Sequence, residues 1–312
     1  MPNKLKCSCL ICNSESNDFY ISTRALMHKP NTEEYRFHKC NMCQAVWLTN
    51  PVSKEDLDNY YTDNYLPYQG SAVWGKYRSF VERSQVQLDK RRVNFVSKWL
   101  NQKDEQTHML DVGCGNPSFL DLVSKKLNIT CTGIDFSDLG WRDKTYNHLN
   151  LRKVSMEDFQ PTELYGVITL WHYLEHDYHP QATIEKLYNC LKPGGKLIIE
   201  VPDYKSMTAK LQKSYWQGWH SPRHLTLFSA VSFREIFQQP KWKILKHQRY
   251  GTMDAFTLWW LGILEKKGIN WAGNMEPKFW PLVFLKILSM PIFIFEKYLP
   301  FGIQTLVVEK KI

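Results

Sequence analysis

Residues 108–120 carry the pattern of a nucleotide-type cofactor site. They predict an apolar strand, a turn with Gly113 and Gly115, and an amphipathic helix over 118–127. Glycines let the backbone pass close beneath a ligand, and the start of a helix would aim amide groups at it. A second predicted strand ends in the Asp135 carboxylate, where a doubly wound sheet holds ribose hydroxyls. A dinucleotide site would need a third glycine, which this turn lacks.

The sequence Asp111-Val112-Gly113-Cys114-Gly115, followed by Gly133-Ile134-Asp135-Phe136-Ser137, resembles the class I S-adenosylmethionine (SAM) dependent methyltransferases. The resemblance implies a seven-stranded, doubly wound (Rossmann-like) α/β sheet that binds SAM. Pro117 departs from the small residue usual in that family, although a first helical turn accepts proline. The cofactor-binding residues that the resemblance implies are Asp111, Gly113, Cys114, Gly115, Asp135, Phe136, Met156, Glu157, Asp158 and Trp171. Asp158, or Glu157 beside it, is expected near the adenine edge, and capping of the next turn is the alternative.

Two Cys-x-x-Cys pairs near the start of the chain predict a structural zinc site. Its ligands are Cys9, Cys12, Cys40 and Cys43. Four thiolates complete the tetrahedral shell that structural zinc prefers, and such a closed site folds a small ribbon that lacks a core of its own. We expect Cys7 and His38 to be bystanders.

An Asn50-Pro51 pair and a tyrosine-rich segment follow the cysteines, and the combination resembles a bacterial subgroup of these methyltransferases with an N-terminal zinc ribbon. Some members of that subgroup act on sugars. Tyr65 is therefore a candidate to stack over the substrate, and packing between ribbon and core is an equal alternative.

Candidate acid–base residues follow the predicted strand 165–171 at the carboxyl edge of the sheet, where ligands bind in open α/β folds. The run from His172 through Glu175 and His176 to Pro180 resembles the ubiquinone-pathway O-methyltransferases, although Gly166 replaces their usual strand aspartate. His172 is a candidate general base, because imidazole titrates near the working pH. Glu175 and His176 would orient it or hold a divalent cation, and stabilising the turn is the alternative.

A tryptophan-rich loop over 216–225 lies on the same edge and resembles the same subgroup. Arg223 would hold a carboxylate or phosphate of the substrate, and His220 or His224 is the rival base.

The remaining pattern divides the chain into a zinc ribbon (1–52), a helical linker or cap (53–105) and a methyltransferase core (106–312). The linker includes a predicted helix over 81–100. Further strands are predicted at 149–154, 197–201, 244–250 and 305–309. An apolar insertion at about 252–302 precedes the last strand. It would form a hydrophobic lid or a peripheral membrane contact, or its two helices would pack together away from lipid.

The formal net charge of +9 is unevenly distributed. Residues 1–60 hold seven Lys/Arg and seven Asp/Glu, so the ribbon is neutral, whereas 76–103 and 241–312 are basic. The first basic stretch is expected to be a solvated helix face. The second lies among apolar runs and suits an anionic membrane surface at least as well as RNA. No apolar segment follows Met1, so a reducing, cytoplasmic location is expected, peripheral to the inner membrane if the insertion binds lipid.

These features predict SAM-dependent methyl transfer to the oxygen of a sugar, a lipid-linked molecule or another small acceptor. The alternatives are an RNA base methyltransferase and a SAM-binding scaffold without catalysis. The neutral ribbon and the lack of an Asn-Pro-Pro-Tyr type loop argue against nucleic acid as a partner. Pro117 and Gly166 favour the scaffold. The sequence does not define the oligomeric state.

Overall fold

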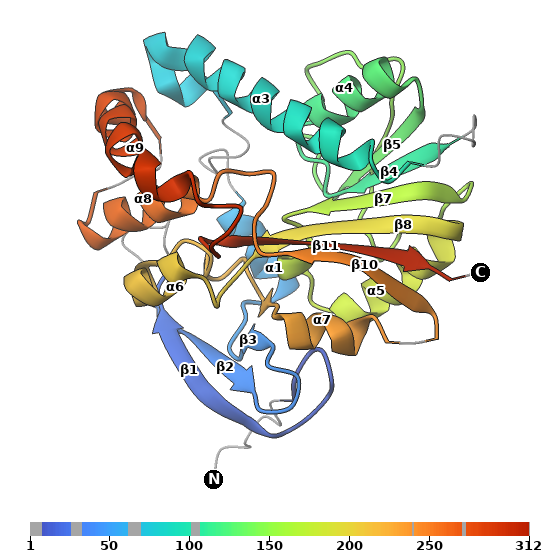
Figure 1. The fold of residues 1–312 in the computed structure, drawn as a ribbon, viewed down its shortest axis with the longest axis horizontal. Coiled ribbons are helices and arrows are strands. Elements are labelled where there is room, and N and C mark those ends of the chain that lie inside the picture. The colour runs from blue at the N-terminus through green and yellow to red at the C-terminus, as the bar shows by residue number, and fades with distance from the viewer. Residues whose placement is uncertain are drawn as a thin grey trace.

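The computed structural model describes residues 8–25, 33–61, 70–100, 107–238, 240–269 and 273–311. Its chain is built on a large seven-stranded sheet and a small four-stranded one (Figure 1). The large sheet has the order β10-β11-β8-β7-β4-β5-β6. Its strands are β4 (His108–Val112), β5 (Thr130–Asp135), β6 (Asn150–Lys153), β7 (Tyr165–Trp171), β8 (Leu191–Pro202), β10 (Trp242–Gln248) and β11 (Ile303–Lys310). The predicted seven-stranded α/β sheet is therefore confirmed.

The direction of the strands sets the edge at which a ligand can bind. β6, β5, β4, β7 and β8 are parallel neighbours, whereas β11 runs antiparallel to both β8 and β10. β4 lies between β5 and β7, so the chain reverses its direction of winding there. The carboxyl ends of β4 and β7 therefore flank the crevice in which open α/β sheets bind ligands.

Helices cover both faces of the large sheet. Figure 1 shows α3 (Arg78–Val96) and α4 (Ser118–Leu127) on one face, and α5 (Pro180–Cys190) and α7 (Ala230–Ile236) on the other. Side chains alternate along a strand, so Met109 belongs to the core beneath α3 and α4, and Leu110 belongs to the core beneath α5 and α7. The helix predicted over 118–127 is confirmed, with Pro117 at its N-cap.

The small sheet is antiparallel and has the order β1-β2-β3-β9. Its strands are β1 (Asn17–Thr23), β2 (Tyr35–Cys40), β3 (Val46–Leu48) and β9 (Thr226–Leu227). β9 directly follows the tryptophan-rich loop, so the four-cysteine segment and that loop share one sheet. Two short turns follow β3, namely α1 (Lys54–Leu57) and η1 (Asp58–Tyr60), and η2 (Ala72–Tyr77) leads into α3.

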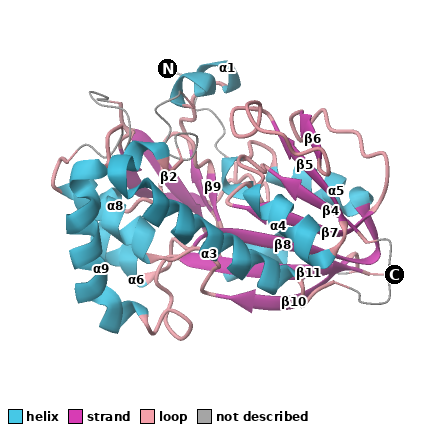
Figure 2. Cartoon of the chain, turned by 90° about the horizontal axis from the view of Figure 1, so that it is seen from above, coloured by secondary structure: helices cyan, strands magenta, loops and turns pink. Residues whose placement is uncertain are grey.

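The apolar insertion forms two helices between β10 and β11, α8 (Phe256–Lys266) and α9 (Phe279–Phe293), joined through η5 (Glu276–Lys278). α6 (Met207–Gln212) and η4 (Lys213–Tyr215) contact α8. Figure 2 shows α6, α8 and α9 gathered at one end of the sheet. Within the described ranges, no helix combines the length and the apolar character that crossing a bilayer requires.

Candidate active site

The turn after β4 has a left-handed backbone at both of its glycines. Gly113 has φ +71° and Gly115 has φ +47°, and a Cβ placed on Gly113 would lie 2.6 Å from Cδ2 of Tyr173. Its amide groups, however, are already bound within the protein. The amides of Gly113 and Cys114 donate to the Ile134 carbonyl at 2.8 and 3.1 Å, and the Gly115 amide donates to Asp135 Oδ2 at 2.9 Å. The amides of the turn itself are therefore used within the protein, and the prediction that the start of α4 aims amide groups at a ligand stays a prediction.

The two carboxylates beside the turn are buried at the ends of neighbouring strands. Burial raises the pKa of Asp111 to about 7, even though Thr169 Oγ1 donates to Asp111 Oδ1 at 2.6 Å. Burial also raises the pKa of Asp135, against the opposing effect of the Ser137 and Gly115 amides. The buried carboxyl groups of Asp111 and Asp135 therefore lie next to the glycine turn.

Two of the predicted cofactor residues have side chains in the protein interior. Cys114 is 7% exposed and packs in the core beneath α3 and α4, so only its backbone lines the turn. The Trp171 ring lies between the Arg92 guanidinium, 4.8 Å away, and the Phe119 ring, 5.6 Å away. These contacts give Trp171 a packing role, and its contact with a cofactor stays a prediction.

The other predicted cofactor residues lie on the carboxyl side of β5 and β6. Phe136 is half-exposed and meets the Tyr61 ring edge-on at 5.3 Å. Met156 is buried, and Glu157 forms an ion pair with Lys54 from α1. Ser155 Oγ donates to Asp158 Oδ2 at 2.7 Å and accepts from the Asp158 amide at 3.1 Å, so Ser155 caps this turn. An adenine contact for any of these stays a prediction.

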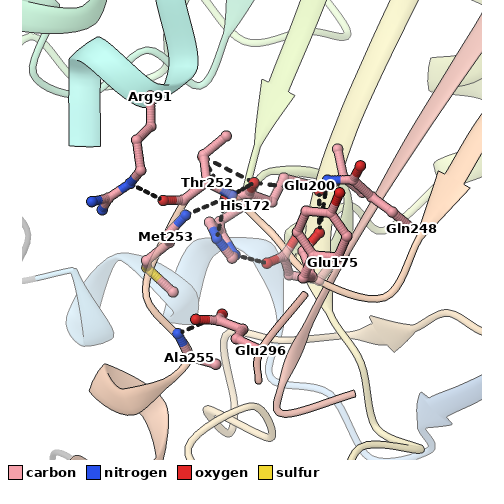
Figure 3. A network of polar contacts seen from close by, with 11 residues as sticks. Arg91, His172, Glu175, Glu200, Gln248, Thr252, Met253, Ala255 and Glu296 are labelled. Carbon is pink, nitrogen blue, oxygen red and sulfur yellow. Dashed lines mark hydrogen bonds and ion pairs between the residues drawn. The ribbon is translucent and has the colours of Figure 1, made fainter. Parts of the chain in front are cut away.

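His172 lies between two fully buried carboxylates (Figure 3). Its Nδ1 is 3.3 Å from Glu175 Oε1, and its Nε2 is 3.3 Å from Glu200 Oε1. Burial would lower the pKa of His172, but the two carboxylates outweigh it and raise that pKa to about 9. The two carboxylates therefore favour the imidazolium form of His172 at neutral pH, and its role as a general base stays a prediction.

Glu200 is the centre of this network and was missed by the sequence analysis. It accepts hydrogen bonds from the Thr252 amide and from Thr252 Oγ1, the latter at 2.9 Å, and from the Met253 amide at 3.3 Å. Burial raises the pKa of Glu200, but His172, Arg92 and the Thr252 amide together bring it below its ordinary value. A carboxylate in the apolar strand 197–201 was the available signal.

A second cluster joins Glu175, His176 and His224. One possible ligand atom from each lies within 4.8 Å of the others. His176 Nδ1 is 3.1 Å from the Arg223 carbonyl, and His224 Nδ1 is 2.8 Å from the Gly218 carbonyl. His176 Nδ1 also lies 3.0 Å from the Tyr61 hydroxyl, which can donate or accept. A carbonyl only accepts, so the Gly218 carbonyl places the proton of His224 on Nδ1, and the Arg223 carbonyl favours the same tautomer in His176.

The electrostatics of this cluster suit neutral imidazoles. Burial lowers the pKa of His176, and burial together with His176 lowers the pKa of His224 well below its usual value. Glu175 is fully buried, and its Oε2 has no hydrogen-bond partner among the described residues. A buried carboxylate oxygen without a protein partner is costly unless a ligand satisfies it.

Arg223 joins the tryptophan-rich loop to the segment after β3. It is 1% exposed, and its Nε donates to the Tyr60 carbonyl at 2.9 Å. Its Nη1 lies 2.9 Å from His220 Nε2, and its guanidinium covers the Tyr61 ring at 5.3 Å. These contacts anchor the loop, and the anion-binding role of Arg223 and the base role of His220 stay predictions. Tyr65 lies outside the described residues.

The four predicted zinc ligands come together at one end of the small sheet. Cys9 Sγ lies 3.5 Å from Cys43 Sγ, Cys12 Sγ lies 3.4 Å from Cys40 Sγ, and all four sulfurs lie within 4.8 Å of one another. Disulfide bonds are about 2.05 Å long, whereas Zn–S bonds of about 2.3 Å give a tetrahedron with edges of roughly 3.8 Å. The cluster therefore fits a zinc ion. His38 binds Asn17 and is not part of the cluster.

The sheet, the glycine turn and the acidic residue after β5 define the class I SAM-dependent methyltransferases. The chain belongs to the methyltransferase domain family, whose model matches residues 79–247. SAM is the cofactor that this family implies.

Individual relatives are more distant. The chain is 29% identical to the ubiquinone biosynthesis O-methyltransferase of Coxiella burnetii over 116 residues, which cover 35% of this chain and 48% of that protein. The corresponding enzyme of Pseudomonas savastanoi is 28% identical, with 35% and 49% covered. The chain thus spans about half the length of these relatives. One similar solved structure is the plantazolicin methyltransferase BpumL in complex with a pentazolic desmethylPZN analog and SAH. The two chains are 15% identical, and the TM-score is 0.49. The match covers 83% of this chain and 100% of that chain.

Proposed function

We propose that this protein transfers the methyl group of SAM to a hydroxyl oxygen of a small-molecule or lipid-linked acceptor, such as a sugar. The observation that carries the proposal is the cluster of Glu175, His176 and His224. Glu175 and His176 follow β7, which is the parallel neighbour of β4, and the glycine turn follows β4. Tyr173, which follows His172, lies over Gly113 and so connects this cluster with the turn. Oxygen as the methylated atom also agrees with the O-methyltransferases that the chain resembles.

Methyl transfer is an in-line displacement, so the protein must align the acceptor, exclude water and accept the hydroxyl proton. His172 is held as an imidazolium by Glu175 and Glu200, and we therefore assign it a positioning role. His176 and His224 are the neutral histidines. A pKa as strongly lowered as that of His224 makes a weak base but keeps the ring in the form that metals bind.

We therefore propose that Glu175, His176 and His224 hold a divalent cation. Glu175 Oε2, buried without a partner among the described residues, is the donor that such an ion would satisfy. The backbone carbonyls that fix the two imidazole tautomers are the orienting contacts usual behind metal-binding histidines. Three protein ligands leave positions for acceptor oxygens, and a bound cation would lower the pKa of a coordinated hydroxyl.

The cation is tested separately from catalysis by Mn²⁺ titration calorimetry on zinc-loaded protein. His224→Asn should weaken Mn²⁺ binding at least roughly tenfold. His247→Asn is the matched control, because His247 binds Gln304 on the β10–β11 pair, away from the cluster. Equal Mn²⁺ binding by wild type and His224→Asn would rule out a cation bound by this cluster.

The acceptor class is tested by incubating the protein and radiolabelled SAM with an extract of its source, then separating lipid, RNA and small polar molecules. We expect label in the lipid or the small polar fraction. Label confined to RNA would show a nucleic-acid methyltransferase. If the protein binds S-adenosylhomocysteine (SAH) but labels none of the fractions, the result would support a SAM-binding scaffold without catalysis.

A further inference from the structure

Helix α9 is apolar around its whole circumference but is covered on one face only. Its sequence is FWPLVFLKILSMPIF, with Lys286 as its only charged residue. One face contributes Phe279 and Phe293 to a cluster with Trp74, Phe256 and Trp260. A helix that is apolar all round is normally buried on every side or lies in lipid.

The uncovered face is a continuous stripe. Trp280, Phe284, Ile287 and Leu288 recur at the spacing of one helix face and are 63%, 69%, 66% and 65% exposed. Phe295 and Tyr298 continue the stripe beyond the helix, 53% and 83% exposed. Scattered apolar residues on a surface are ordinary, but a contiguous stripe of this kind marks a contact with a partner or a membrane.

The ends of the stripe favour a membrane. Trp280 and Tyr298 mark its two ends, and Lys278 and Lys297 stand beside them. Amphipathic rings and long cationic side chains are the residues that settle at the headgroup level of a bilayer. Lys286, the only charge within the helix, is paired with Asp254 at 2.7 Å.

A basic pocket adjoins the end of the stripe. It has a volume of about 220 Å³ and is lined by Arg91 and Lys98 of the α3 segment, Lys246 of β10 and Lys297, with no carboxylate among its described lining residues. Lys297 lines the pocket and directly precedes Tyr298 of the stripe, so adjacent residues of the chain join the two features. Four cations around one concavity suit a phosphate group.

We propose that this surface docks on an anionic phospholipid bilayer, with the α9 stripe inserted among the lipid chains and the basic pocket on a lipid phosphate. A second copy of the chain fits less well, because a two-fold contact through this patch would bring its own lysines toward one another. The proposal goes beyond methyl transfer, since it concerns where the protein is held rather than what it modifies.

Sedimentation with vesicles tests the docking surface. Wild-type protein should bind phosphatidylcholine vesicles that contain phosphatidylglycerol, bind pure phosphatidylcholine weakly, and lose binding as salt increases. Phe284→Glu combined with Ile287→Glu should abolish binding, because it places two charges in the stripe. Phe19→Glu changes a similarly exposed phenylalanine (59%) on β1 and should bind as wild type does.

The pocket is tested by Lys297→Glu, which should weaken binding to the anionic vesicles at least roughly fivefold. Lys126→Glu, on the exposed face of α4, is its control. SAH binding by each variant, measured by calorimetry, shows that its fold is intact. A loss of vesicle binding with normal SAH binding then concerns the docking surface and not methyl transfer. Failure of wild type to bind the anionic vesicles would overturn the proposal, as would unchanged binding by the Phe284/Ile287 variant. Light scattering that shows a dimer broken by that variant, without vesicle binding, would assign the stripe to a second copy.

Discussion

Glu200→Gln tests the network around His172 most sharply. The pKa of His172 is raised from 6.5 to about 9, a difference equivalent to roughly 3 kcal/mol in favour of the imidazolium. Glu175 and Glu200 share this effect, so neutralising Glu200 should remove about half of it. The new side-chain amide would also meet the Thr252 donors, at a cost of about 1 kcal/mol. We expect the free energy of unfolding near neutral pH to fall by about 2–3 kcal/mol.

The pH dependence gives a second measure of the same network. Folded protein holds the His172 proton up to about pH 9, whereas an unfolded chain releases it near 6.5. The stabilisation is therefore complete below 6.5 and is lost as the pH rises through 9. Wild type should lose about 1.4 kcal/mol per pH unit between about pH 7 and 9, and Glu200→Gln should stop losing stability about one unit earlier.

Urea denaturation across this pH range measures both quantities, and NMR titration of the histidine rings measures the pKa of His172 directly. Glu309→Gln is the matched control, because Glu309 pairs with Lys196 at 2.7 Å at a partly exposed position on β11. It should cost at most about 1 kcal/mol and leave the alkaline dependence unchanged. Identical pH dependence in wild type and Glu200→Gln would refute the assignment of His172 as a carboxylate-held imidazolium.

Two further predictions concern the cofactor turn and the ribbon. Gly113→Ala should weaken SAH binding at least roughly tenfold in calorimetry, because the new Cβ would meet Tyr173. Gly268→Ala is the control. Gly268 has a similar positive φ of +66° but open space around it, so this variant should bind SAH as wild type does. An equal loss in both variants would mean that strain, not the Tyr173 contact, is responsible. Purified protein should contain one zinc ion per chain by metal analysis. Cys40→Ser should lose this ion and have a lower melting temperature. Cys190→Ser changes a buried thiol outside the cluster and should retain zinc. Full zinc content in Cys40→Ser would place the ion elsewhere.

Much of the sheet could be predicted from the sequence because β4, β7, β8 and β11 are local, largely apolar runs. The helix after Gly115 was equally local, and its bounds were correct. β9 could not be predicted, because its two residues form a strand only by pairing with Val46 and Trp47. The four cysteines were predictable because the two cysteines of each Cys-x-x-Cys pair lie on one turn. Their spacing in the sequence is therefore enough to place the two sulfurs of a pair close together.

The candidate site shows the limit of local reasoning. His172 has a suitable position for a base, but its protonation depends on Glu200, which is opposite Trp171 only because β7 and β8 are neighbours in register. Arg92 lies in a basic stretch expected to face solvent, yet its Nε is buried and its guanidinium covers Trp171. The partner of each charge came from another element, and the spacing of residues along the chain did not contain that information.

Methyl transfer by the cluster of Glu175, His176 and His224 is the central claim. Its most direct test is the transfer of label from radiolabelled SAM to material extracted from the source, compared between wild type and His224→Asn at equal SAH affinity. We expect wild type to label a lipid or small polar acceptor, and His224→Asn to lose at least roughly a hundredfold in rate while still binding SAH. Labelling by His224→Asn at the wild-type rate would contradict the central claim.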